Sequence, residues 1–141
     1  MKQSAHILEV TTRGKGLYEC TSNISRWTGQ QQMQTGLLTI FCRHTSASLL
    51  IQENADPTVR VDLQAYFDRI APDSGPYQHD SEGPDDMSAH LKTALTQVQL
   101  TVPLVNSKLA LGTWQGIYLF EHRVRPPVSY THLTLPTTPY V

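Results

Sequence analysis

The sequence lacks three features that would direct a first interpretation: an excess of charge of one sign, a long apolar run and a cysteine framework. With 11 Lys and Arg against 12 Asp and Glu, the formal net charge is −1, so no electrostatic field favours nucleic acid or an anionic membrane. No apolar run approaches the roughly 20 residues that span a membrane, and the opening MKQSAHILEV lacks the apolar core of a secretory signal. We therefore expect a cytoplasmic protein that binds neither nucleic acid nor membranes.

A chain of 141 residues suits one domain with a sizeable core. Cys20 and Cys42 do not form a CxxC pair, and we expect two reduced, buried thiols. Alternating apolar residues predict strands, and apolar residues at helical spacing predict helices. The strands are expected at 5–12, 36–44 and 49–51 and in a meander over 98–123, and the helices begin near Asn23, at Asp56-Pro57 and at Asp85 or Asp86. In the second helix, we expect a buried stripe of Val59, Leu63, Tyr66, Phe67 and Ile70.

The last fifteen residues do not fit this pattern. They are crowded with Thr and Pro, and Pro136 and Pro139 restrict any strand there to a sheet edge or a tail. The run VSYTHLTLPTT resembles a translated sequencing adapter. We therefore take residues 1–127 as a single α+β domain and 128–141 as an atypical tail that resembles foreign sequence. The tail is expected to be poorly packed, leaving one sheet edge open.

Six histidines are the compositional feature that stands out, because histidine is the commonest metal ligand and titrates near neutral pH. His44 ends a predicted strand, where a buried surface meets a polar rim. Thr45, Ser46 and Ser48 follow it at once. Hydroxyls and backbone amides in such a turn either cradle an anion such as phosphate or form an ordinary Ser/Thr turn.

The other histidines of interest come from separate segments. His79 and Asp80 lie in a long acidic loop, a segment that is either functional or simply solvated. Asp86 precedes His90 by one helical turn, so it either fixes the tautomer of a metal-binding ring or makes a plain helix-face hydrogen bond. If these segments converge with His122, three imidazoles suit a zinc-like ion with an open position, and nearby carboxylates carry protons. The spacing alone does not force this convergence.

Three longer stretches resemble the secondary thiamine-phosphate synthase enzyme family. They are HTSASLLIQENADPTVRVDL, YQHDSEGPDDMSAHLK and GTWQGIYLFEHR, in that order, and the resemblance runs from about residue 4 to Arg125. It implies an α+β fold with a bent or split, mainly antiparallel sheet, packed by two main helices and assembled as a homotrimer. It also implies thiamine-phosphate synthase activity, in which a pyrimidine pyrophosphate is joined to a thiazole phosphate with loss of pyrophosphate.

The resemblance further implies one site in which the matched residues gather around a divalent metal, for which zinc is the expected ion. Catalytic roles fall to His44, Asp80 and Glu121, substrate or phosphate binding to Thr45, Ser46, Ser48, Asn54, Trp114 and Gln115, and metal binding to His79, His90 and His122. Asp56 and Glu82 are matched as well. The expected function is a metal-assisted enzyme acting on a small phosphorylated metabolite. The alternative is a non-catalytic trimer that binds a metal or metabolite, and a purely structural trimer explains the clustered polar residues least well.

Overall fold

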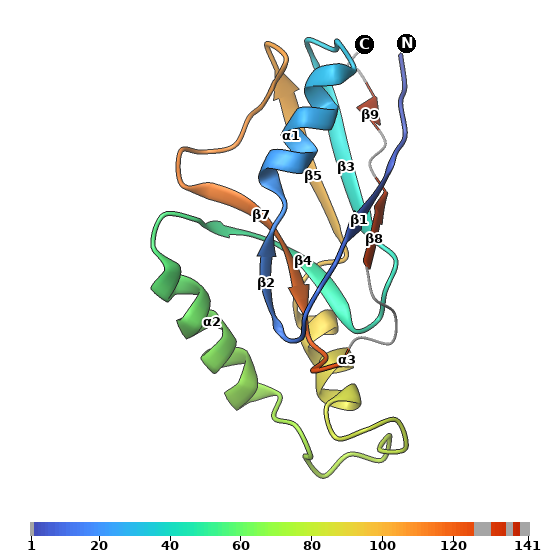
Figure 1. Ribbon diagram of the computed structural model, residues 1–141, viewed down its shortest axis with the longest axis vertical. Helices are drawn as coiled ribbons and strands as arrows, with labels where there is room; N and C mark the ends of the chain where they lie inside the picture. Colours follow the sequence, from blue (N-terminus) through green and yellow to red (C-terminus); the bar gives the residue numbers. More distant parts are fainter. Residues whose placement is uncertain (1, 126–130, 135–136, 139–141) are drawn as a thin grey trace.

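Alternating apolar residues build two antiparallel sheets that share one core (Figure 1). The computed structural model describes residues 2–125 and the backbone of 131–134 and 137–138. The larger sheet has the order β1-β8-β3-β5-β6, with β9 pairing β3, and the smaller sheet has the order β2-β7-β4. The strands are β1 (Ile7–Val10), β2 (Gly16–Glu19), β3 (Gly36–Cys42), β4 (Ala47–Glu53), β5 (Gln99–Val105), β6 (Lys108–Leu109), β7 (Gln115–Glu121), β8 (Thr131–Thr134) and β9 (Thr137–Thr138). The helices are α1 (Thr21–Gln30), α2 (Pro57–Ile70) and α3 (Asp86–Leu95).

The core lies where the two sheets and α1 meet. In the larger sheet, the β3–β5 register sets Leu38 opposite Val102 and Ile40 opposite Leu100, with all four side chains buried. Ile24 of α1 is also fully buried and belongs to the same cluster. The segment before β5 joins the sheets, because its carbonyl groups accept hydrogen bonds from both β3 and β4. These features confirm the single-domain α+β fold with a split antiparallel sheet.

Helix α2 begins where the sequence predicted but packs less deeply than expected. Asp56 caps it by accepting hydrogen bonds from the Thr58 backbone N–H at 2.9 Å and from the Thr58 hydroxyl at 2.7 Å. None of its residues is buried, so the prediction of a core stripe is wrong. The helix lies beside only the small sheet (Figure 1), where Phe67 packs edge-on against Phe120.

In the C-terminal tail, the prediction of an open sheet edge is wrong where the structure describes the backbone. Strand β8 pairs with β1 over four residues and with β3 over two, so it lies between them. The expected open edge is therefore filled at this place, because a backbone ladder needs only extended residues, and THLT contains good β-formers. Residues 126–130, 135–136 and 139–141, on which the rest of the packing prediction falls, lie outside the described residues.

Two further expectations concern the cysteines and the membrane. Cys20 and Cys42 are free and buried, as expected. Within the part of the chain that the structure describes, no helix combines the length and apolar character needed to cross a membrane.

Candidate metal centre

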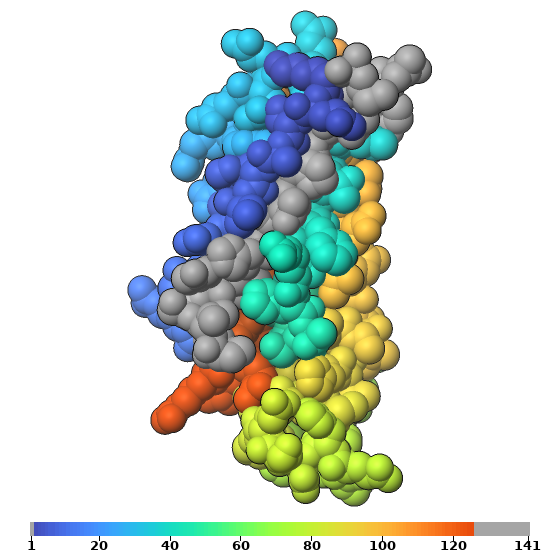
Figure 2. All heavy atoms as spheres, turned by 90° about the vertical axis from the view of Figure 1, so that its right-hand side faces the viewer, coloured from blue at the N-terminus to red at the C-terminus, as the bar shows by residue number. Residues whose placement is uncertain are grey.

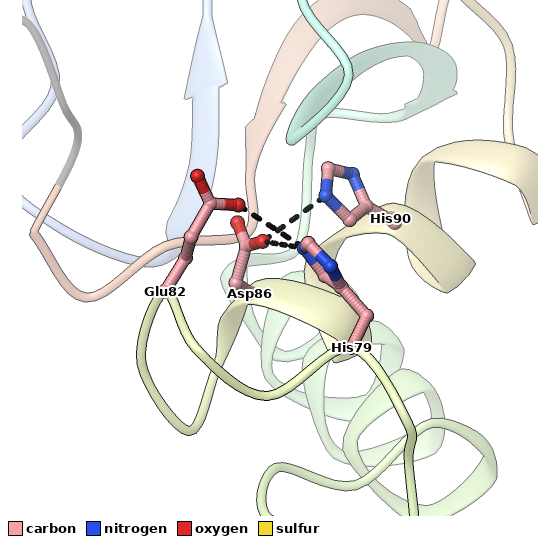
Figure 3. Close-up of side chains that lie close together, drawn as sticks. All are labelled: His79, Glu82, Asp86 and His90. Atoms are coloured by element: carbon pink, nitrogen blue, oxygen red, sulfur yellow. Dashed lines mark hydrogen bonds and ion pairs between the residues drawn. The ribbon is translucent and has the colours of Figure 1, made fainter.

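Four side chains of types that can bind a metal ion meet where the loop after α2 leads into α3 (Figure 3). His79 and Glu82 come from the loop, Asp86 is the first residue of α3, and His90 follows one turn later. One ligand atom from each residue lies within 4.8 Å of the ligand atoms of the other three. Ligand atoms around a four-coordinate zinc lie roughly 3.3 Å apart, so modest rotations of the side chains suffice for coordination.

Asp86 is the central residue of this group. Its Oδ2 atom lies 2.7 Å from His79 Nε2 and 3.1 Å from His90 Nε2. His79 Nε2 also lies 3.1 Å from Glu82 Oε2. The carboxylate of Asp86 is almost fully buried, whereas His79 and Glu82 are exposed. Asp86 therefore forms the buried side of the group, and His79 and Glu82 form the side that is open to solvent.

The orientation of the His90 ring is set by its other nitrogen. His90 Nδ1 donates a hydrogen bond to the Thr45 carbonyl oxygen at 2.9 Å. Both ring nitrogens can donate only in the imidazolium form. Loss of the Nε2 proton leaves a lone pair on the atom that faces Asp86 and His79. A backbone carbonyl that holds Nδ1–H in this way is the usual support of a metal-binding histidine.

Contacts within the group stabilise the protonated form of His79 and the ionised form of Asp86. The hydrogen bond to Asp86 is the main cause of the raised pKa of His79, to which the charges of Asp86 and Glu82 add. Burial alone would raise the pKa of Asp86. The hydrogen bonds of His79 and Glu82 act in the opposite direction, as do the positive charges of His90 and Arg123. Together they outweigh burial, and the pKa of Asp86 is lowered. Asp86 is thus an anion throughout the neutral range, as a metal ligand must be.

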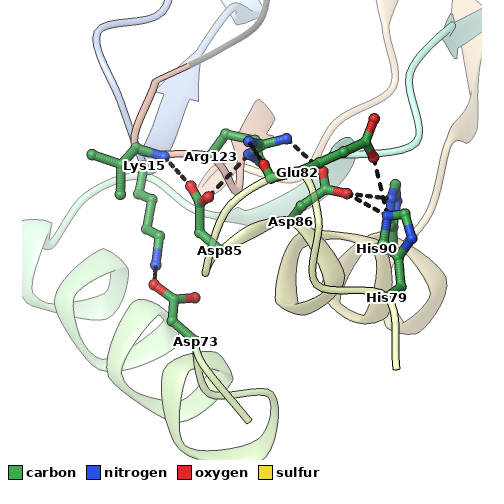
Figure 4. A network of polar contacts seen from close by, with 9 residues as sticks. Lys15, Asp73, His79, Glu82, Asp85, Asp86, His90 and Arg123 are labelled. Carbon is green, nitrogen blue, oxygen red and sulfur yellow. Dashed lines mark hydrogen bonds and ion pairs between the residues drawn. The ribbon is translucent and has the colours of Figure 1, made fainter. Parts of the chain in front are cut away.

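Arg123 contacts Asp86, on the buried side of the group (Figure 4). Its Nη1 pairs with Asp86 Oδ1, on the side of the carboxylate away from the histidines, and its Nη2 donates to the Glu82 carbonyl at 2.9 Å. Asp85 lies 3.2 Å from Arg123 Nε and accepts a hydrogen bond from the Val124 N–H at 2.8 Å. Sequence reasoning missed Arg123, although a basic residue just after a strand and a long acidic loop were available as a charge-complementarity signal.

His122 is not a member of the group, contrary to the sequence prediction of three imidazoles around one ion. Its ring is 1% exposed, and its Nε2 lies 2.8 Å from the Ser48 hydroxyl. Burial is the main cause that lowers the pKa of His122 to about 3, and the positive charge of Lys92 is the second cause. The His122 N–H donates to the Ser46 carbonyl, which adds one hydrogen bond beyond the last pair of the β4–β7 ladder.

The other residues to which we assigned catalysis are dispersed. Glu121 is buried, and burial raises its pKa to about 7, with Arg123 acting in the opposite direction. Asp80 is exposed in the loop beside His79. His44 lines a cavity together with Thr45 and His90. His44 thus shares this cavity with His90 of the candidate metal centre, and Asp80 adjoins the candidate centre in sequence.

The predicted phosphate-binding residues fall into two places. Thr45 supplies its carbonyl to His90, and Ser48 is fully buried between His122 and Thr96. Asn54 pairs with the Trp114 carbonyl at the far end of the β4–β7 pair. There the Asn54 side chain donates to Glu19 and that of Gln115 accepts from the Gly112 N–H. The seven-pair ladder from Ala47–Glu121 to Glu53–Gln115 separates the two ends by about 20 Å. Within one chain the predicted residues therefore form two groups.

Comparisons with known proteins identify the family. The family model described as UPF0047 protein YjbQ-like matches residues 6–133. The UPF0047 protein sll1880 of Synechocystis is 49% identical over 126 residues, which cover 89% of this chain and 86% of that protein. The chain belongs to the UPF0047 family. The match extends to residue 133, beyond the boundary at 127 that the sequence suggested.

Solved structures of UPF0047 and related proteins agree with this fold. The conserved hypothetical protein TT1486 from Thermus thermophilus is 32% identical, with a TM-score of 0.79, over 93% of this chain and 97% of that one. A YbjQ-like protein of unknown function from Sulfolobus solfataricus reaches a TM-score of 0.87 over 96% of each chain, and at 22% identity it shows the fold alone.

This family replaces the one inferred from the sequence motifs. The resemblance to a thiamine-phosphate synthase family is wrong, because the family model and the curated relatives that match are those of UPF0047. The thiamine-phosphate synthase and transferase assignments are removed with it. The homotrimer that the same resemblance implied stays a prediction.

Proposed function

We propose that the protein is a divalent-metal-dependent hydrolase that acts on small phosphate esters at the His79–Asp86–His90 centre. One observation supports this most directly: two imidazole nitrogens and two carboxylates from two segments lie within 4.8 Å of one another. Two histidines and one carboxylate are the ligand set of many catalytic zinc and iron sites, which keep a position open for substrate. Zinc is the ion that we expect.

The four residues have distinct roles in this proposal. His79, Asp86 and His90 hold the ion, which when bound polarises a phosphoryl oxygen of the ester. Glu82, whose side chain is 64% exposed, takes a proton from the attacking water as its oxygen bonds to phosphorus. The phosphorus–oxygen bond of the ester breaks, and the leaving oxygen takes up the proton that Glu82 removed from the water, so that the alcohol and phosphate are released and Glu82 is ionised again. Asp86 stays ionised because Arg123 and the imidazoles hold its charge.

A second candidate is a protein that binds a metal ion without catalysis. Asp86 is fixed on both sides, by two imidazoles and by Arg123, and such rigidity suits tight binding as well as it suits turnover. Glu82 distinguishes the two candidates, because hydrolysis needs a proton carrier and binding alone does not.

The metal centre is tested by histidine substitution. We expect His79→Ala and His90→Ala to lose bound zinc in elemental analysis and titration calorimetry, because each removes a ligand nitrogen. His6→Ala is the matched control, since His6 stacks on Trp27 away from the centre. His122→Ala should keep the metal but unfold more easily. Equal zinc content in the His79→Ala, His90→Ala and wild-type proteins would refute the centre.

The catalytic step is tested with p-nitrophenyl phosphate and with protein loaded with zinc, manganese or iron(II). We expect metal-dependent phosphate release, and Glu82→Gln should lower kcat by at least about a hundredfold while the metal stays bound. Release that continues after complete chelation would contradict the proposal. Metal binding without hydrolysis of any ester would favour the second candidate.

A further inference from the structure

A cavity of about 840 Å³ lies between the end of β3 and α3. Figure 2 shows this side of the molecule, with the turquoise of β3 and its turn beside the yellow of α3, above the loop that holds His79. The volume falls within the range of small-molecule sites, about 300–1,000 Å³. His90 belongs both to the cavity wall and to the metal centre. A ligand in the cavity therefore has one end next to the centre.

The wall combines apolar side chains with one permanently charged cation. Phe41, Ala94 and Val98 line it, and Phe41 is 42% exposed although it is a large apolar side chain. Arg43 also lines the cavity and forms no ion pair within the described part of the chain. The cavity thus offers an apolar surface and a cation.

We infer that this cavity binds the apolar, ring-sized body of a phosphate ester whose phosphate group reaches the metal centre past His90. This inference rests on the proposed function and adds the class of substrate to it. A sugar phosphate would bring several hydroxyl groups to an apolar wall, and each hydroxyl left without a partner weakens binding. A ring body covers Phe41 and Val98, and the positive charge of Arg43 in the cavity wall attracts an anionic ligand.

The test uses two ligands that share an anionic group and differ only in the ring. Naphthylmethylphosphonate and methylphosphonate both carry a phosphonate on carbon, so neither has an ester bond to hydrolyse. We expect zinc-loaded protein to bind the naphthyl compound at least about tenfold more tightly, as measured by titration calorimetry. Arg43→Gln should weaken the binding of both compounds by a similar factor.

Two exposed neighbours on α3 supply matched variants. Ala94→Trp fills the cavity from an exposed position, whereas Leu95→Trp adds the same ring next to it, outside the cavity wall. The first should abolish the advantage of the naphthyl compound and keep its zinc content, and the second should leave that advantage unchanged. An advantage that is absent in the wild type, or that persists in Ala94→Trp, overturns the inference. Because binding is measured without turnover, a failure of the hydrolase proposal would appear separately, in the p-nitrophenyl phosphate assay.

Discussion

At the scale of single residues, burial shifts the pKa values of two neighbours in opposite directions. They are Glu121, the last residue of β7, and His122, which follows it. It raises the pKa of Glu121 from 4.5 to about 7, with Arg123 lowering it and Asp85 raising it. It lowers the pKa of His122 from 6.5 to about 3, and nearby lysines add to the effect. Both groups are thus mainly uncharged in the folded protein over most of the range between pH 3 and 7.

The signs of the two effects on stability follow from proton uptake. The folded protein binds the Glu121 proton more tightly than the unfolded chain does, so this stability is present below pH 4.5 and is lost as the pH rises to about 7. The unfolded chain binds the His122 proton more tightly, so that contribution is present above pH 6.5 and is lost as the pH falls toward 3. Between pH 4.5 and 6.5 the two slopes oppose and cancel.

Glu121→Gln should therefore reveal a pH dependence that the wild type hides. We expect its free energy of unfolding to rise with pH between 4.5 and 6.5 with a slope of up to about 1.4 kcal/mol per pH unit, because the opposing contribution of Glu121 is removed and that of His122 remains. The wild type should be nearly flat in that range. Urea unfolding at pH 4.5, 5.5 and 6.5 measures both slopes, and parallel curves for the two proteins would rule out the pKa assignments.

Arg123 allows a prediction about positioning rather than charge. Arg123→Lys keeps the positive charge but loses the planar fork that holds Asp86 and the Glu82 carbonyl together. We expect zinc affinity to fall by about tenfold or more, with Arg69→Lys, on the exposed side of α2, as the control. Calorimetry at fixed pH gives the affinity, and an unchanged value would show that the charge alone matters.

At the scale of helices and strands, the pairing of β8 leads to a test by truncation. β1 pairs only with β8 in the described sheet. A chain ending at Arg125 should therefore lose hydrogen-exchange protection at Ile7–Val10. The β3–β5 ladder should keep its protection, because its partner strands remain. Unchanged protection of β1 in the truncated chain would show that β8 does not hold it.

Local rules predicted some elements well and others poorly. The start of α2 follows from Asp56-Pro57, and the Asp86–His90 contact follows from helical spacing, since both depend on residues a few positions apart. The stripe on α2 was wrong because its burial depends on how much sheet lies beneath the helix. The approach of His79 to Asp86 depends on the path of a long loop, which no local pattern determines.

At the scale of the whole molecule, the described residues of one chain bring only part of the predicted site together. His79 and His90 meet, and His122 does not join them. Asn54, Trp114 and Gln115 lie at one end of the β4–β7 ladder, about 20 Å from the end where Ala47 pairs with Glu121. Motif order along the chain holds no information on such distances, because strand length and pairing determine them only after folding.

The position of β8 also has a consequence for biosynthesis. β1 is synthesised more than a hundred residues before its partner strand β8. At roughly 5–20 residues per second, the first strand waits for several seconds at least without its neighbour. During that interval a nascent chain would expose an unpaired strand, and a chaperone that shields extended segments would have its clearest target there.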